Sequence, residues 1–245
     1  MIDFYFYLTA AIGVVLFGIS KGGFAGPIAI LAIPIMALSM SPVVAAAILL
    51  PVLFVMDVVA LYIYWNNWDL KNIKIIIHPA IFGIAIGALT FKYSSDDSIR
   101  IIIGIIAILF ILLSIIQKNS LFIKPTKTKG IFWALVGGYT SFIIHSGGTP
   151  VNFYLLPQKL NKTVYIGTIT LAFLIINAIK LIPYYLLNQL IISNLKISLI
   201  LSPLAPISIY VGYYLHKKVK EETFYSVIYF LLGISGIKLI YDGIF

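Results

Sequence analysis

The sequence predicts an all-α polytopic membrane protein built from two inverted repeats of about five hydrophobic segments each. The first observation behind this prediction is composition: 61% of the 245 residues are hydrophobic and 10% are charged, whereas soluble domains average roughly 45–50% apolar and about 25% charged residues. The second is the length of the apolar runs, because a helix needs about 20 such residues to cross a bilayer. The third is a weak internal repeat. Together these features argue against a water-soluble fold.

Ten apolar segments follow one another, separated by short polar stretches. They cover residues 4–17, 24–39, 43–64, 72–91, 98–117, 130–145, 149–158, 163–187, 195–215 and 223–243. Several are short for a full span. Only residues 18–23 separate the first two, and only 145–148 separate the sixth and seventh. We therefore expect broken or re-entrant helices at these two glycine-rich turns.

Basic loops predict the orientation of the chain. The richest loop holds Lys118, Lys124, Lys127 and Lys129, and positively charged loops stay in the cytoplasm. Counting segments outward from it places these lysines on the same side: Lys71, Lys74, Lys159, Lys162, Lys217, Lys218 and Lys220. Both termini then lie outside. The net charge of +9 fits anionic lipids at the cytoplasmic face, and we expect no nucleic-acid partner.

The two halves of the chain resemble each other. Lys21-Gly22-Gly23 matches Ser146-Gly147-Gly148, and Asp57 then falls opposite Asn177. The sequence thus divides into a first transmembrane repeat, a cytoplasmic basic linker and a second transmembrane repeat, at residues 1–117, 118–129 and 130–245. An odd number of segments per half inserts the halves upside down relative to each other. Such inverted repeats are typical of transporters, which bind substrate where the repeats meet.

The two glycine-rich turns are the candidate substrate site. Unwound backbone persists at membrane depth only where protein or a water-filled cavity satisfies its polar groups. A helix that restarts there points free N–H groups and its positive end at the cavity, which favours an anion. We assign substrate binding to these residues: Lys21, Gly22, Gly23, Phe24, His145, Ser146, Gly147, Gly148, Thr149, Asn152, Asn177 and Lys180. Alternatively, the glycines only allow close helix packing.

Ionisable residues inside apolar runs need compensation, because a charge at the bilayer centre costs about 2.5–3.5 kcal/mol on insertion scales. A bound anion or the carboxylate of Asp57 would compensate Lys21, unless its side chain reaches the surface. Asp57 is either half of an ion pair that locks the two halves or the site of a coupling proton or cation. His145 either serves the substrate or a coupled proton, or is structural.

Several classes of chemistry have little support in the sequence. The chain has no cysteine, and no histidine or carboxylate spacing suggests a metal site, so we expect no cofactor. No serine, histidine and carboxylate constellation is apparent, so we do not expect an enzyme. The sequence leaves open whether the protein forms a homodimer.

Four stretches carry a family resemblance: GISKGGFAG at residues 18–26, AAAILLP at 45–51, HSGGTP at 145–150 and LLPQKL at 155–160. Their order and spacing resemble the TauE/SafE sulfite exporter family, also called toluene-sulfonate uptake permeases, over nearly the whole chain. The resemblance implies a multi-pass carrier of the bacterial-type inner membrane for sulfite, organosulfonates or related small oxyanions, coupled to an ion gradient. The family includes export and uptake, so the direction of transport does not follow.

The functional hypothesis is alternating access between the two inverted halves around a site at the two turns. The alternative within the same fold is a carrier or channel for a carboxylate or another small oxyanion. An intramembrane enzyme or a structural partner protein, which would show no substrate flux, belongs to a third class.

Overall fold

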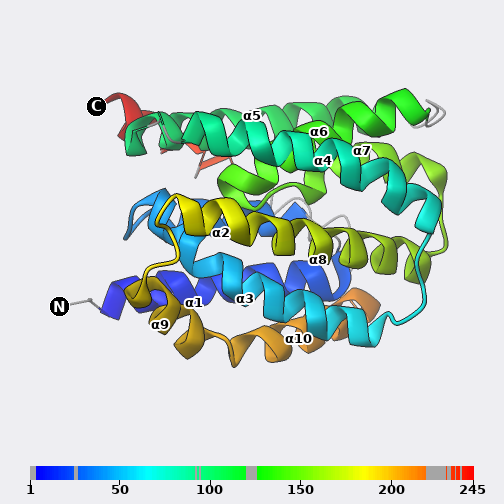
Figure 1. The fold of residues 1–245 in the computed structure, drawn as a ribbon, viewed down its shortest axis with the longest axis horizontal. Helices are drawn as coiled ribbons and strands as arrows, with labels where there is room; N and C mark the ends of the chain where they lie inside the picture. Colours follow the sequence, from blue (N-terminus) through cyan, green and yellow to red (C-terminus); the bar gives the residue numbers. More distant parts are fainter. Residues whose placement is uncertain are drawn as a thin grey trace.

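The computed structural model describes residues 4–24, 27–91, 93, 95–119, 126–218, 230, 233–234, 236–237 and 239–245. Within these ranges every regular element is a helix (Figure 1), so the predicted all-α fold is confirmed. Residues 120–125 of the predicted linker, most of the tenth segment and Lys220 lie outside the described residues. The division into two repeats therefore stays a prediction here.

The helices follow the predicted segments closely. Their bounds are α1 Phe4–Ile19, η1 Ser20–Phe24, η2 Pro27–Leu31, α2 Ala32–Met36, α3 Pro42–Ile63, α4 Leu70–Phe91, α5 Asp96–Asn119, α6 Lys127–Ile144, α7 Gly148–Leu155, η3 Leu156–Gln158, α8 Lys162–Leu186, α9 Ile192–Leu201 and α10 Leu204–Lys218. The ninth segment differs, because α9 and α10 are bent by 45° at Ser202 and Pro203. Proline lacks the N–H that would continue the helix.

Side-chain caps fix where two central helices begin. Ser41 Oγ accepts a hydrogen bond from the Val43 amide (3.2 Å) in front of α3, and Asn161 Oδ1 accepts one from the Thr163 amide (3.0 Å) in front of α8. Such caps satisfy backbone donors that have no partner within the helix. The positions of Asp57 in α3 and Lys180 in α8 are thereby set relative to a defined helix start.

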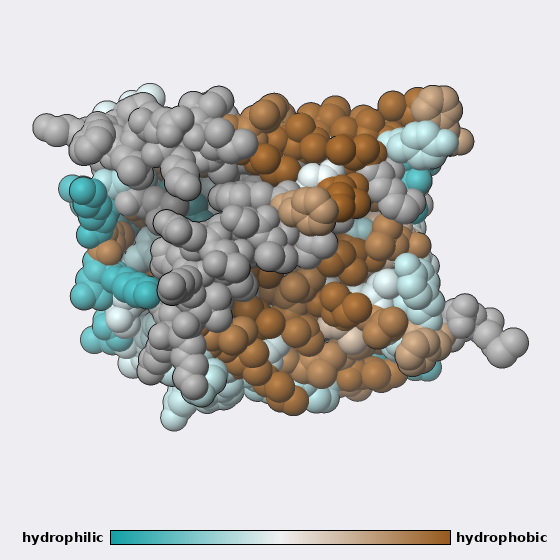
Figure 2. Space-filling model, turned by 180° about the vertical axis from the view of Figure 1, so that it is seen from behind, coloured by the Kyte–Doolittle hydropathy of each residue, from teal (hydrophilic) through white to brown (hydrophobic). Residues whose placement is uncertain are grey.

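The apolar surface identifies a multi-pass membrane protein. Four described spans are long and apolar enough to cross a bilayer, at Phe4–Gly23, Pro42–Ile63, Leu70–Phe91 and Lys162–Leu186. The bent α9–α10 pair is either a broken fifth span or a re-entrant loop. Large apolar side chains on these elements are exposed, among them Phe82, Leu89, Ile182 and Leu199. Figure 2 shows apolar residues over the middle of the described surface, with hydrophilic residues towards its two ends. This distribution suits a hydrocarbon layer between two aqueous phases.

Close helix contacts place α3 and α8 at the centre. α8 packs against both α3 and α4 (Figure 1). α4 and α6 approach so closely that a Cβ added to Gly138 would lie 2.1 Å from the Ala80 carbonyl oxygen. On the other side, a Cβ added to Gly212 of α10 would lie 2.3 Å from the Ile19 carbonyl oxygen of α1. These contacts enclose the polar side chains of α3 and α8.

Candidate anion site

The first turn holds Lys21 inside the helix bundle. After Ile19 the helix widens into the π-helical turn η1, and the described chain resumes as the 3₁₀ helix η2. π-helical turns occur frequently at functional sites. The Lys21 ammonium forms an ion pair with Asp57 of α3; the side chain of Lys21 is 16% exposed and that of Asp57 is 1% exposed. The structure thus brings these two predicted residues together.

The second turn places His145 against α3 and α8. α6 ends at Ile144, and His145 adopts a left-handed conformation with φ 55°, which is uncommon for a residue other than glycine. The imidazole Nε2 lies 2.8 Å from the Ala46 carbonyl oxygen, and Nδ1 lies 2.5 Å from the Lys180 ammonium. A carbonyl oxygen only accepts, so Nε2 carries the hydrogen and Nδ1 accepts from Lys180. The ring of His145 is therefore neutral in this arrangement.

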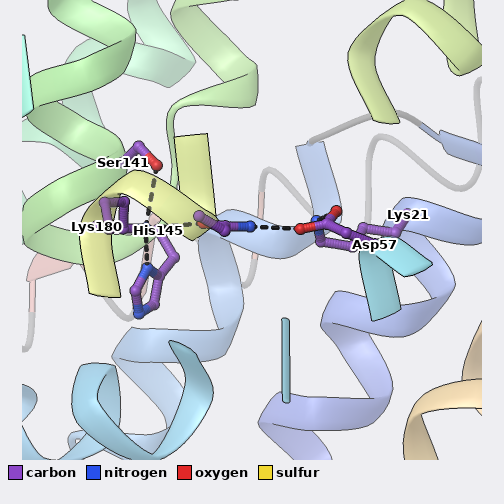
Figure 3. A network of polar contacts seen from close by, with 6 residues as sticks. Lys21, Asp57, Ser141, His145 and Lys180 are labelled. Atoms are coloured by element: carbon purple, nitrogen blue, oxygen red, sulfur yellow. Dashed lines mark hydrogen bonds and ion pairs between the residues drawn. The ribbon is translucent and has the colours of Figure 1, made fainter. Parts of the chain in front are cut away.

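Asn177 joins the two turns into one network. Figure 3 labels its other members, Lys21, Asp57, Ser141, His145 and Lys180. The amide nitrogen of Asn177 donates to Asp57 Oδ2 over 2.6 Å, and its carbonyl oxygen accepts from the Lys180 ammonium over 3.1 Å. Lys180 also donates to Ser141 Oγ over 3.2 Å. The three hydrogens of the Lys180 ammonium thus face Ser141, Asn177 and His145, and each has an acceptor.

One of the two lysines in the network has no carboxylate partner. The charges of Lys21 and Asp57 balance each other, whereas Lys180 is fully buried and, among the described residues, forms no ion pair. Its partners Ser141, Asn177 and the neutral His145 are dipoles. A protonated Lys180 would lack a counter-ion, and an anion bound at this centre would supply one.

A cavity borders the network. Its volume is about 50 Å³, several times the roughly 10–15 Å³ that one water molecule requires. Its polar lining comes from Ser20, Lys21, Asp57, His145, Ser146, Thr170 and Asn177. The space suits a small ion with a few polar contacts.

Two hydroxyl groups beside the cavity have unused hydrogen-bonding capacity. In the described part of the chain, Ser146 Oγ and Thr149 Oγ1 are buried without a hydrogen-bond partner, an arrangement that costs about 1–3 kcal/mol per group. They flank the start of α7 at Gly148, where the first-turn amides of Gly148 and Thr149 have no partner within the helix. Ser146 and Gly148 line the cavity itself. The start of α7 therefore offers several donors.

The remaining predicted residues lie around this centre in other roles. A Cβ on Gly22 would lie 2.1 Å from the Ile209 carbonyl oxygen, and one on Gly147 would lie 2.4 Å from the Gly137 carbonyl oxygen, so both glycines permit close packing. Gly23 is buried in the same π-helical turn. Asn152 accepts a hydrogen bond from the Tyr165 hydroxyl over 2.8 Å. The side chain of Phe24 lies outside the described residues.

Sequence reasoning missed Ser141 and two tyrosines. Ser141 of α6 precedes His145 by four residues, and this spacing, which would put two side chains on one face of a continuous helix, was the available signal. The hydroxyls of Tyr64 and Tyr184 donate to the carbonyl oxygens of Gly22 (3.0 Å) and Phe142 (2.8 Å). No sequence motif indicates these two contacts, because a backbone acceptor leaves no trace in residue type.

The fold and the centre define a class: a multi-pass helical membrane protein with ionisable side chains in its interior, a combination typical of transporters. The family model described as sulfite exporter TauE/SafE matches residues 10–239, nearly the whole chain. The chain belongs to the TauE/SafE family, a family of membrane transporters, and the resemblance in its motifs is confirmed. No curated protein and no solved structure matches it.

Proposed function

We propose that the protein is a secondary transporter of small sulfur-containing anions such as sulfite or an organosulfonate, working by alternating access. The observation that carries this proposal is a buried lysine without a carboxylate partner, Lys180, next to Asn177 of a cavity with unused donors. Charge-assisted hydrogen bonds to an oxyanion are about twice as strong as neutral ones. The family to which the chain belongs agrees in substrate class.

The anion is placed between the first turn and the start of α7. There it accepts hydrogen bonds from the Lys21 ammonium, the Ser146 hydroxyl and the amides of the first turn of α7, with Lys180 supplying charge from behind Asn177. Oxygen atoms arranged around one central atom, as in sulfite or a sulfonate group, can accept from several directions at once. The small cavity favours sulfite or a short sulfonate over a bulky one.

Matching contacts in α3 and α8 support inverted repeats. Asp57 and Asn177 hydrogen-bond to each other from equivalent places, and two helical turns beyond each a tyrosine donates to the backbone beside the glycine-rich turn of its own half. Such paired roles are what two related halves would produce, and they permit the halves to rock against each other.

The cavity also suggests which side this conformation faces. Along α8 its lining runs from Asn177 to Ile166, towards the end of the helix that begins at Lys162. That end is cytoplasmic by the positive-inside rule. We infer a state in which the cavity extends towards the cytoplasm.

The test is exchange of labelled sulfite by the purified protein in liposomes, with acetate and methanesulfonate as competitors. Sulfite exchange above protein-free liposomes, inhibited by methanesulfonate but not by acetate, supports the proposal. Exchange of acetate without exchange of sulfite would assign the alternative carboxylate carrier. A flux that does not saturate and shows no counterflow would indicate a channel.

A pair of serine variants tests the placement of the anion. Ser146→Ala removes the unused cavity hydroxyl, and we expect the apparent sulfite affinity to fall about 10-fold, as for loss of a hydrogen bond to a charged group. Ser202→Ala is the matched control, because its hydroxyl donates to the Ser198 carbonyl oxygen away from the cavity. Equal affinities in both variants would contradict this placement.

A further inference from the structure

The ion pair between Lys21 and Asp57 stands where the proposed anion must bind. Both side chains line the cavity, and the Lys21 ammonium faces Asp57 Oδ1. An anion that draws the Lys21 ammonium towards itself takes it away from Asp57. The substrate and Asp57 therefore compete for one cation.

The two oxygens of Asp57 have different surroundings. Oδ2 accepts from the Asn177 amide nitrogen over 2.6 Å. The Lys180 ammonium donates to the carbonyl oxygen of the same Asn177 amide over 3.1 Å, and this contact fixes the orientation of the amide. Oδ1 faces Lys21 and loses that partner once the ammonium turns to an anion. Asp57 would then be a buried carboxylate with one neutral donor, which is strongly unfavourable.

No second cation in the described part of the chain can replace Lys21. The charged and titratable groups facing Asp57 are Lys21 from η1 and Lys180 from α8, with His145 behind Lys180. Lys180 keeps its three hydrogens on Ser141, Asn177 and His145. A proton is then the simplest way to neutralise Asp57, and Oδ1 is the free position for it.

We propose that Asp57 carries the coupling proton of the transporter, so that one proton and one anion cross the membrane together. The proton comes from water on the side where the anion binds, attaches to Oδ1 as Lys21 turns to the anion, and returns to water on the other side. The Oδ1–H group also donates to the bound anion. In the protein without a bound anion, Lys21 and Asp57 pair again. The protein then returns to its first conformation without carrying a proton. This inference rests on the proposed anion transport.

The test compares two modes of transport in liposomes that contain the full-length protein. Exchange without any gradient first identifies whether sulfite or methanesulfonate is carried. Accumulation of that anion is then driven by a pH gradient, with the membrane potential held at zero by potassium and valinomycin. With one proton per anion, wild-type protein should accumulate the anion about tenfold per pH unit, towards the alkaline side.

Two matched variants separate coupling from transport. Asp57→Asn keeps the shape but cannot exchange a proton; we expect it to exchange the anion at an altered rate, above protein-free liposomes, and to show no accumulation driven by pH. Asp97→Asn makes the same chemical change on an exposed residue at the start of α5. It should accumulate the anion as the wild type does.

The outcomes distinguish the two proposals. Wild-type protein that exchanges neither anion contradicts the proposed function. Wild-type protein that exchanges one of them but does not respond to a pH gradient contradicts proton coupling alone. Asp57→Asn that still accumulates the anion assigns the proton to another group. If this variant does not fold, Asp57→Glu decides: it should keep accumulation driven by pH, and exchange without such accumulation would overturn the assignment.

Discussion

A lysine lies at each of the two glycine-rich turns, but the two lysines have different partners. Lys21 at the first turn has a carboxylate partner and borders the cavity, whereas Lys180 behind the second turn is fully buried among dipoles. In the proposed mechanism, the first arrangement opens when a substrate anion replaces Asp57 as the partner of Lys21. The second arrangement cannot open in this way, because a protonated Lys180 that lost one of its hydrogen-bond partners would be a poorly solvated buried charge. One lysine is thus suited to contact the substrate, and the other to maintain a positive field.

The largest effect should come from breaking the first arrangement. Lys21→Ala removes the contacting cation, and at alkaline pH, where Asp57 has not taken up a proton, its carboxylate stays in the cavity and repels an anion. We expect the rate of sulfite exchange, measured in liposomes at equal protein content, to fall by a factor on the order of 100. Breaking a buried charge pair costs enough free energy to account for a loss of this size.

A second substitution sharpens that result. In Lys21→Ala with Asp57→Asn, assayed at the same alkaline pH, the repelling carboxylate is gone while Lys180 remains, so part of the lost exchange should return, by about tenfold relative to the single variant. Lys21→Ala with Asp97→Asn is the control, and it should recover nothing. A double variant as inactive as Lys21→Ala would show that repulsion by Asp57 is not the reason for the loss.

A smaller effect concerns the packing of the second turn. A Cβ at Gly147 would meet Gly137 O at 2.4 Å and Ser141 Cβ at 2.6 Å, whereas a Cβ at Gly233 would meet only Ile111 Cδ1, at 3.7 Å. Gly147→Ala should therefore destabilise the protein by about 1–3 kcal/mol, seen as a lower midpoint of thermal unfolding. Gly233→Ala should change it little. Equal midpoints would show that the turn adapts.

The smallest effect compares the two tyrosines. Tyr64→Phe and Tyr184→Phe each remove one hydrogen bond to a carbonyl oxygen beside a turn, which should cost about 0.5–1.5 kcal/mol. If the halves are related as proposed, both variants should slow sulfite exchange to a similar degree. A loss confined to one variant would argue that the tyrosines do not have equivalent roles.

How far the sequence predicts this structure depends on the range of the interaction. Apolar runs predicted α3 and α8 within a residue or so, because burial in lipid is a local property of a segment. The partners of Lys180 were only partly predictable: Asn177 lies on the same helix face, but Ser141 and His145 come from a distant part of the chain. Gly22 was read for its possible contact with substrate, yet its close neighbour Ile209 comes from the far end of the chain.

The most direct measurement is the stabilisation that sulfite gives to the purified Lys180→Met variant. Lys196→Met is the matched control, because Lys196 is an exposed lysine of α9. A ligand that binds only the folded state raises the unfolding temperature. We predict that sulfite raises it for wild-type protein and Lys196→Met but not for folded Lys180→Met. The same rise in Lys180→Met would contradict the claim that its buried charge holds the anion.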